Sequence, residues 1–184
     1  MDEYMDRYHR FLEGEDDQLE VLVEKYRYGL SMFVNGIVKN ICIAEDVMQD
    51  TFVMLAIKRP KFKGESSFRT WLYTIARNKA LDYLKKIARK RTIPIDECFE
   101  MSDEQDVERQ YIKEEERREL HRAMIKLKTE YAQVIYLTFF EEFSGKETAA
   151  IMHKTPKQVE NLLFNAKKAL KEELERSGFV YEDI

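Results

Sequence analysis

Three carboxylates lie close together in the stretch AEDVMQDTF, which spans residues 44–52. Glu45, Asp46 and Asp50 fall within one short segment of a predicted helix, and the amide of Gln49 lies among them. Paired carboxylates can act as general acid and base, or bind a divalent metal ion. They can also form a solvated helix face or dock onto a basic protein partner. The elements around them must decide between these uses.

Hydrophobic spacing places the acids on the outer side of a helix predicted over residues 44–59. Its buried stripe would consist of Val47, Met48, Thr51, Phe52 and Leu55. The opposite row, at i, i+3, i+4 and i+7, contains Asp46, Gln49, Asp50 and Val53. Neither a His or Cys at ligand spacing nor a glycine-rich phosphate loop accompanies these acids. The pattern favours a protein interface; we expect no catalytic residues, no metal site, no cofactor and no enzyme activity.

Composition favours a helical protein. The 184 residues are 44% apolar and 36% charged, and they include only 6 Gly and 3 Pro. This suits one larger or two small domains with modest cores. No apolar run approaches the roughly 20 residues that span a bilayer, and the N-terminus MDEYMDRYHR is unlike a signal peptide. Two cysteines outside any C-x-x-C pair fit a reducing cytoplasm, with Cys42 as a small core residue.

The charge is distributed unevenly along the chain. The overall net charge is −4, but residues 61–91 hold ten Lys or Arg against two acids, a local charge of +8. A basic block inside an acidic chain indicates contact with a polyanion at one place. The long helix predicted from Phe68 toward Arg91 would turn one polar face outward, with Arg69, Thr70, Tyr73, Thr74 and Arg77. Guanidinium groups bind phosphates, and Tyr or Arg planes can stack on unpaired bases.

The C-terminal stretch 143–170 has the punctuation of a helix-turn-helix. Ser144 and Glu147 form a capping box for a short helix. Thr155, Pro156 and Gln158 begin a second helix after a tight turn at His153–Lys154. The outward face of this second helix would offer groups suited to base edges and phosphates: Lys157, Gln158, Glu160, Asn161, Phe164, Asn165 and Lys168.

The chain therefore divides into two helical segments. Residues 92–110 contain seven acids against one base and predict an acidic linker between segments 1–91 and 111–184. Before the linker we expect helices over 17–30, 31–41, 44–59 and 68–91. After it we expect a charged helix over 111–128, an apolar segment over 131–142 and the helix-turn-helix. The predicted class is all-α, with two small domains.

Taken together, AEDVMQDTF, FKGESSFRTWLYTIARNKALDYLKK and the C-terminal helix pair resemble bacterial RNA polymerase sigma factors of the extracytoplasmic-function group, in the sigma-70 family. The resemblance covers roughly residues 15–91 as sigma region 2 and 111–176 as region 4. It implies a protein that binds core polymerase, recognises −10 and −35 promoter elements, and helps to open the DNA. The −35 helix departs from the family pattern, because Glu160, Leu162 and Asn165 occupy positions that are commonly basic.

The resemblance also implies site residues and partners. The β′ clamp helices of the polymerase would contact Asp46, Gln49, Asp50 and Val53, and the β flap would be a second contact. The −10 single strand would contact Lys61, Phe62, Lys63, Gly64, Glu65, Ser66, Ser67, Arg69, Thr70, Tyr73, Arg77, Asn78 and Lys79. The −35 element would contact the outward face from Lys157 to Lys168. Family members are commonly inhibited by an anti-sigma factor, often a membrane-bound one.

The residues alone are also compatible with two other functions. A helix-turn-helix repressor or activator working as a dimer would use the C-terminal helices but does not need the 44–59 row. A hydrolase would use Glu45, Asp46 and Asp50. Metal-dependent turnover that the Asp50→Ala substitution abolishes would support this function.

Overall fold

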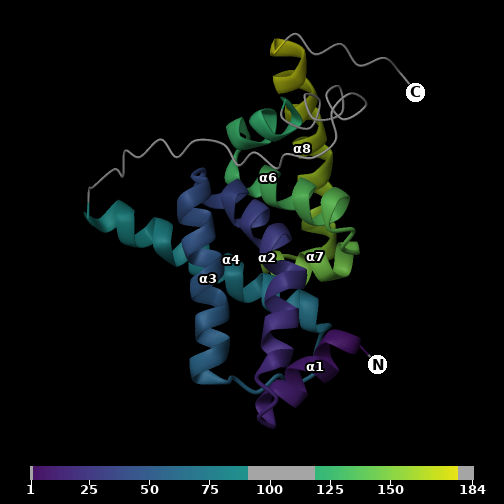
Figure 1. The fold of residues 1–184 in the computed structure, drawn as a ribbon. Helices are drawn as coiled ribbons and strands as arrows, with labels where there is room; N and C mark the ends of the chain where they lie inside the picture. Colours follow the sequence, from purple (N-terminus) through teal and green to yellow (C-terminus); the bar gives the residue numbers. More distant parts are fainter. Residues whose placement is uncertain (1, 91–118, 178–184) are drawn as a thin grey trace, which may run out of the picture.

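A computed structural model of the protein describes residues 2–90 and 119–177 (Figure 1). The regular elements of these residues are helices, in agreement with the predicted all-α class: α1 (Glu3–Leu12), α2 (Asp17–Val38), α3 (Ile41–Lys58), α4 (Phe68–Lys90), α6 (Thr129–Ile135), the π-helix η1 (Tyr136–Phe140), α7 (Gly145–Met152) and α8 (Pro156–Arg176). Residues 119–126 are helical as well. The predicted linker and the first part of the predicted 111–128 helix lie outside the described residues.

Two N-terminal elements differ from the predictions. The segments 17–30 and 31–41 form one helix, α2, which continues through Gly29 and Ser31 without a break. It ends at Lys39, whose φ of 58° is left-handed and whose N–H donates to the Asn35 carbonyl at 2.9 Å. Helix α1 was not predicted, although Tyr4, Tyr8 and Phe11 follow helical spacing.

A single carboxylate caps two helices of the N-terminal segment. Asp2 Oδ1 accepts from the Tyr4 N–H at 3.1 Å and begins α1. Its Oδ2 accepts from the Phe68 N–H at 2.9 Å, at the start of α4. Ser67 adds a second cap there, since its Oγ accepts from the Thr70 N–H at 3.1 Å. The first turns of α1 and α4 are therefore held together although they are far apart in sequence.

The N-terminal core surrounds α2. This helix packs against α1, α3 and α4, and it contributes fully buried apolar side chains such as Leu22, Leu30 and Phe33. Aromatic rings fill the region between α1 and α4, with Tyr8 ring centroids 5.3 Å from both Phe68 and Trp71. Burial of apolar and aromatic side chains supplies most of the stability of a small helical segment.

The C-terminal segment contains the predicted helix-turn-helix. Both capping boxes are present, at Ser144 with Glu147 and at Thr155 with Gln158. His153 ends α7 in a left-handed conformation with a φ of 53°, and the Lys154 N–H donates to the Ala149 carbonyl at 2.9 Å. The predicted turn at His153–Lys154 is therefore confirmed, with a histidine where glycine is the usual residue.

The apolar segment predicted over 131–142 is α6 continued by η1. The Glu141 N–H donates to the Tyr136 carbonyl at 3.1 Å, five residues earlier, as a π-helical turn requires. The wider turn leaves Phe139 and Phe140 largely exposed while Tyr136 and Leu137 are buried. The sequence predicts an apolar segment here but not its π geometry.

The two segments lie against each other and share one core. Helix α6 packs on α2, and α7 packs on α4, as Figure 1 shows in the middle of the molecule. Buried apolar residues from both segments form a single continuous cluster that runs from Tyr8 to Ala166. The expected division into two domains therefore does not leave a gap between them in this arrangement.

Cys42 was predicted to be a small core residue, and that prediction is wrong. The residue is half-buried at the start of α3 and is disulfide-bonded. The other cysteine of the chain, Cys98, lies outside the described residues. Among residues 2–90 and 119–177, no helix combines the length and the apolar character needed to cross a bilayer.

Candidate polymerase and nucleic-acid interfaces

The acidic row of α3 faces solvent. All five residues of the predicted stripe are buried, and the Thr51 hydroxyl donates to the Val47 carbonyl at 2.8 Å inside the bundle. This fixes the rotation of α3, so that its outer row is exposed: Asp46, Gln49, Asp50 and Val53. In the described part of the chain no group of three or more His, Cys, Asp or Glu could hold a metal ion. The carboxylates form a surface rather than a pocket.

One apolar residue extends this row beyond the prediction. Ile57 is 76% exposed and follows Val53, which is 50% exposed, by one helical turn. An exposed isoleucine next to an exposed valine is typical of a protein contact. The i+4 spacing from Val53 was available in the sequence and could have identified Ile57. We define the docking row as Asp46, Gln49, Asp50, Val53 and Ile57.

The loop before α4 is largely open. Most of its members are exposed: Lys61, Lys63, Gly64, Glu65 and Ser66. Gly64 has a φ of 72°, a conformation that favours glycine, and its surroundings are open. Phe62 is buried, with its ring centroid 5.2 Å from that of Trp71, and it therefore anchors the loop. Ser67 is half-buried because it caps α4.

The polar face of α4, which we expected to be outward, is covered. Thr70 and Arg77 are buried, Tyr73 is fully buried, and Arg69 and Thr74 are half-buried. The expectation that this face is open is wrong for this arrangement, because α7 and the loop that precedes it pack over it. We refer to Arg69, Thr70, Tyr73, Arg77 and Asn78 as the α4 face.

Arg69 contacts an acid and an aromatic ring of the C-terminal segment. Its Nη2 forms an ion pair with Glu141 Oε2 at 2.6 Å and also donates to the Glu141 backbone carbonyl. The guanidinium carbon lies 4.1 Å from the centre of the Phe143 ring. One turn further along, the Tyr73 ring lies between Phe33 and Phe143, with centroids at 5.4 and 5.1 Å. Burial and the Glu141 carboxylate raise the pKa of Tyr73, which keeps its phenol neutral.

The remaining members of the α4 face also contact the C-terminal segment. Arg77 Nε donates to Gln133 Oε1 at 2.7 Å, and both side chains are buried. Burial lowers the pKa of the Arg77 guanidinium from its ordinary value. Asn78 is exposed, and its Oδ1 accepts from His153 Nε2 at 3.3 Å. Lys79 is half-buried. The hydrophobic pattern of the sequence did not predict that Gln133 or Glu141 contacts α4.

A second junction joins α2 to residues 119–126. Asn35 Nδ2 lies 3.2 Å from His121 Nε2, so the ring nitrogen accepts and the imidazole is neutral. Lys39 Nζ donates to the Met124 carbonyl at 3.4 Å. Burial lowers the pKa of Lys39 to about 8, and burial together with the Lys39 charge lowers the pKa of His121. This junction therefore prefers both bases uncharged.

The outward face of α8 is exposed to solvent in the described part of the chain. Asn161, Phe164, Asn165 and Lys168 are exposed, and Phe164 is 74% exposed. Three neighbouring side chains are already engaged at the start of α8, since Gln158 Oε1 accepts from the Thr155 N–H at 2.8 Å and Lys157 pairs with Glu160 at 2.8 Å. The amides and lysine beyond the first turn are thus the groups most available to a duplex groove.

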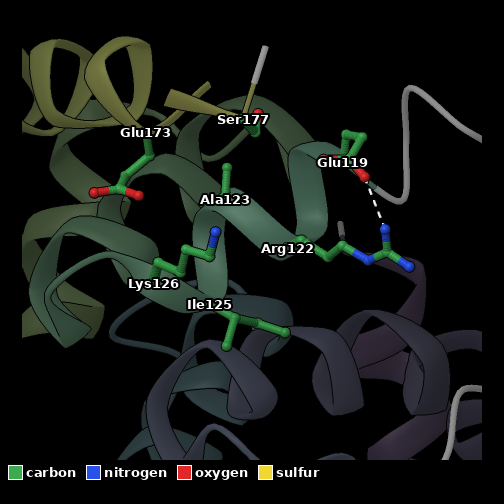
Figure 2. A pocket seen from close by; sticks show the side chains of 7 residues that line it. All are labelled: Glu119, Arg122, Ala123, Ile125, Lys126, Glu173 and Ser177. Carbon is green, nitrogen blue, oxygen red and sulfur yellow. Dashed lines mark hydrogen bonds and ion pairs between the residues drawn. The ribbon is translucent and has the colours of Figure 1, made fainter. Parts of the chain in front are cut away.

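An open pocket lies between the 119–126 helix and the C-terminal end of α8 (Figure 2). A Glu119–Arg122 ion pair of 2.7 Å closes one side of it. None of the predicted polymerase or DNA contacts lines it; its wall consists of Glu119, Arg122, Ala123, Ile125, Lys126, Glu173 and Ser177.

Comparison with known proteins agrees with this layout. The family model for sigma-70 region 2 matches residues 22–91, and the model for sigma-70 region 4 matches residues 117–170. RNA polymerase sigma factor YlaC of Bacillus subtilis is 28% identical over 163 residues, which cover 88% of this chain and 94% of that protein. The ECF RNA polymerase sigma-E factor of Escherichia coli is 29% identical over 172 residues, 88% of each chain.

Two solved structures share the fold. CnrH, determined in complex with the cytosolic domain of CnrY, has a TM-score of 0.67 at 23% identity and covers 94% of this chain and 97% of that one. The sigma factor RpoE of Bartonella quintana, determined with the anti-sigma factor NepR, has a TM-score of 0.68 at 20% identity, with coverage of 85% and 96%. The two family models together span most of the chain. The protein belongs to the sigma-70 family of bacterial RNA polymerase sigma factors, in the extracytoplasmic-function group, and directs core polymerase to promoters rather than catalysing a reaction itself.

Proposed function

We propose that the sigma-factor activity is divided between two surfaces of opposite character. The docking row of α3 contacts the β′ clamp helices of core polymerase, and the outward face of α8 reads the −35 element. This assignment rests on the charged and polar groups that the two surfaces expose. The α3 row presents two carboxylates and no base, which repels DNA, whereas the free part of the α8 face presents two amides and a lysine.

We assign recognition of the −10 element to the loop 61–67 and the α4 face. The loop is exposed and carries Lys61 and Lys63, which suit a phosphate backbone. Its glycine would let a flipped base approach the backbone closely. The α4 face supplies Arg69, Arg77 and Tyr73, the groups that hold an unpaired strand by charge and stacking. Unstacking a base costs a few kcal/mol, and two tethered DNA contacts can offset it.

Localisation and inhibition follow from the same assignment. A protein that acts on RNA polymerase works in the cytoplasm. The fold is shared with CnrH, whose structure was determined with the cytosolic domain of CnrY, and with the sigma factor RpoE, determined with the anti-sigma factor NepR. We therefore expect an anti-sigma factor as a protein inhibitor of this chain.

In vitro transcription tests the assignment. Purified core polymerase plus this protein should produce RNA from discrete start sites on genomic templates, and core polymerase alone should not. Aligning the regions upstream of those start sites should reveal two shared elements. Absence of promoter-dependent RNA from every genomic fragment would contradict the proposal. Tight binding to a palindrome without polymerase would instead support a dimeric helix-turn-helix regulator.

A further inference from the structure

The loop 61–67 is held at both of its ends by residues 2–16. We propose that α1 and its flanking acids position this loop for capture of a −10 base, with Tyr8 and Asp2 as the positioning residues. This inference rests on the proposed −10 role of the loop. It adds a determinant of −10 recognition that lies before residue 22, where the match to the region 2 family model begins.

The Tyr8 hydroxyl fixes the chain where it enters the loop. It donates to the Pro60 carbonyl at 2.8 Å, one residue before Lys61. Proline has no N–H, so this carbonyl is the only main-chain hydrogen-bonding group of residue 60. Tyr8 is fully buried, and burial raises the pKa of its phenol to about 12. The hydroxyl therefore keeps its hydrogen and remains a donor at neutral pH.

A second contact holds the residue before Pro60. Arg59 follows the last residue of α3 and has a left-handed φ of 43°. Its guanidinium carbon lies 4.7 Å from the centre of the buried Phe11 ring, and its Nη2 pairs with Asp16 Oδ1 at 2.8 Å. The ion pair is exposed and stabilises little, whereas the ring gives the guanidinium a fixed surface. Residues of α1 and of the turn after it thus set the direction in which the chain leaves α3.

Asp2 holds the other end of the loop. Its Oδ2 accepts from the N–H of Phe68, the first residue of α4, and its Oδ1 accepts from the Tyr4 N–H in α1. A carboxylate is favourable at the N-terminus of a helix because the helix dipole is positive there. The Tyr8 ring also lies 5.3 Å from the Phe68 ring, so α1 contacts both ends of the loop. Figure 1 shows α1 beside the chain that joins α3 to α4.

The part of the loop between these ends is open to DNA. Phe62 is its buried residue, and the Trp71 ring that Phe62 contacts also lies 5.3 Å from the Tyr8 ring. Gly64, with a φ of 72° and open surroundings, adds no side chain that could hold the loop. Fixed ends reduce the conformational entropy that the loop loses when it closes on a base. A loop held in one geometry also rejects a wrong base more strongly, because a misfitting base cannot be accommodated by movement of the loop.

Two variants test the two ends of the loop separately. Tyr8→Phe removes the hydroxyl and keeps the buried ring, and Asp2→Ala removes the cap that α1 and α4 share. Tyr28→Phe is the control for the first, since Tyr28 is 52% exposed on α2. Asp6→Ala is the control for the second, since Asp6 is an exposed acid in the first turn of α1. Each full-length chain, with core polymerase, would transcribe a library randomised over the −10 element of the promoter on which wild type gives most RNA.

Both test variants should lower the ratio of RNA from preferred to disfavoured −10 sequences by about threefold to tenfold, the effect of losing one or two hydrogen bonds. The two controls should keep the wild-type ratio. A role of Tyr8 and Asp2 in folding alone would lower RNA from every template by the same factor. An unchanged ratio in both test variants would therefore overturn the proposal, and so would an equal fall in the controls.

A second measurement follows the loop without DNA or polymerase. Amide hydrogen exchange in peptides covering residues 59–68 should be about threefold faster or more in Tyr8→Phe and Asp2→Ala than in wild type, with exchange in α8 unchanged. Wild-type exchange of the loop in both variants would refute the positioning role. If the wild-type chain gave no promoter-dependent RNA, the proposed function would fail, and this measurement would still decide whether α1 positions the loop.

Discussion

Arg77 in α4 donates its Nε hydrogen to Gln133 Oε1 in α6 at 2.7 Å, and both side chains are buried between the two halves of the molecule. The Gln133 amide nitrogen is held in turn by the Thr129 carbonyl at 3.2 Å. A guanidinium in such a place is tolerated because its charge has a fixed acceptor. The same side chain is proposed to bind phosphate in the open complex.

Replacing that acceptor should loosen the packing of the two segments against each other, which we call closure. Gln133→Leu leaves the Arg77 guanidinium without its Gln133 partner, which costs about 1–3 kcal/mol for a buried donor. In the open form both side chains are hydrated, so the change acts on closure rather than on either half alone. We expect a larger radius of gyration by small-angle X-ray scattering. Gln49→Leu, at an exposed amide of α3, should leave the radius unchanged, and equal radii in both variants would contradict the reasoning.

Acid should weaken closure in two separate steps. The pKa of Lys39 is lowered from 10.5 to about 8, so the stability that its neutral form contributes is lost as pH falls from about 10.5 to 8. The pKa of His121 is also lowered, so a second loss begins as pH falls through its ordinary value of 6.5. Scattering or interdomain fluorescence transfer between pH 5 and 10.5 would follow both steps.

Two variants separate these steps. Lys39→Met removes the alkaline step and leaves the acid one. His121→Gln, whose amide can still accept from Asn35, removes the acid step and leaves the alkaline one. A pH profile that neither variant alters would show that other groups control closure.

Charge reversal on α3 should weaken polymerase binding without unfolding the protein. Asp50 is exposed and lies in the docking row, so Asp50→Lys would place a cation against the basic partner that this row suits. We expect a loss of affinity for core polymerase of roughly tenfold or more, greatest at low salt. Glu13→Lys, at an exposed position just after α1, is the control, and circular dichroism should show the same melting temperature for both. Normal affinity in Asp50→Lys would contradict the docking assignment.

Two substitutions in α8 should have different effects on promoters. Asn161→Ala removes an exposed amide that can read a base edge, which should relax preference at one −35 position by about 1–3 kcal/mol. Lys168→Ala removes a phosphate contact and should weaken all promoters about equally. Transcription from a template library randomised over the −35 element would distinguish them. A uniform loss in both variants would remove Asn161 from the base-reading set.

The sequence predicted those features that depend on one element alone. The buried stripe of α3 and the two capping boxes follow from spacing within a single helix, and the structure has them at the predicted residues. The covering of α4 could not be predicted this way. Its outward polar face looks solvent-exposed on a helical wheel, and its contacts Gln133 and Glu141 come from a segment more than fifty residues away. The π-helical turn that presents Glu141 has no simple sequence signature either.

The covered face of α4 has a consequence for how such a protein can change over time. Arg69, Tyr73 and Arg77 contact the C-terminal segment, and their proposed −10 role would add contacts with nucleic acid, so each substitution there would affect two sets of contacts. The exposed positions of α8, such as Asn161 and Phe164, are not buried against the other segment. Under the proposed −35 role of α8, new promoter preferences can therefore arise by drift at Asn161 or Phe164 while the packing between the two segments is retained.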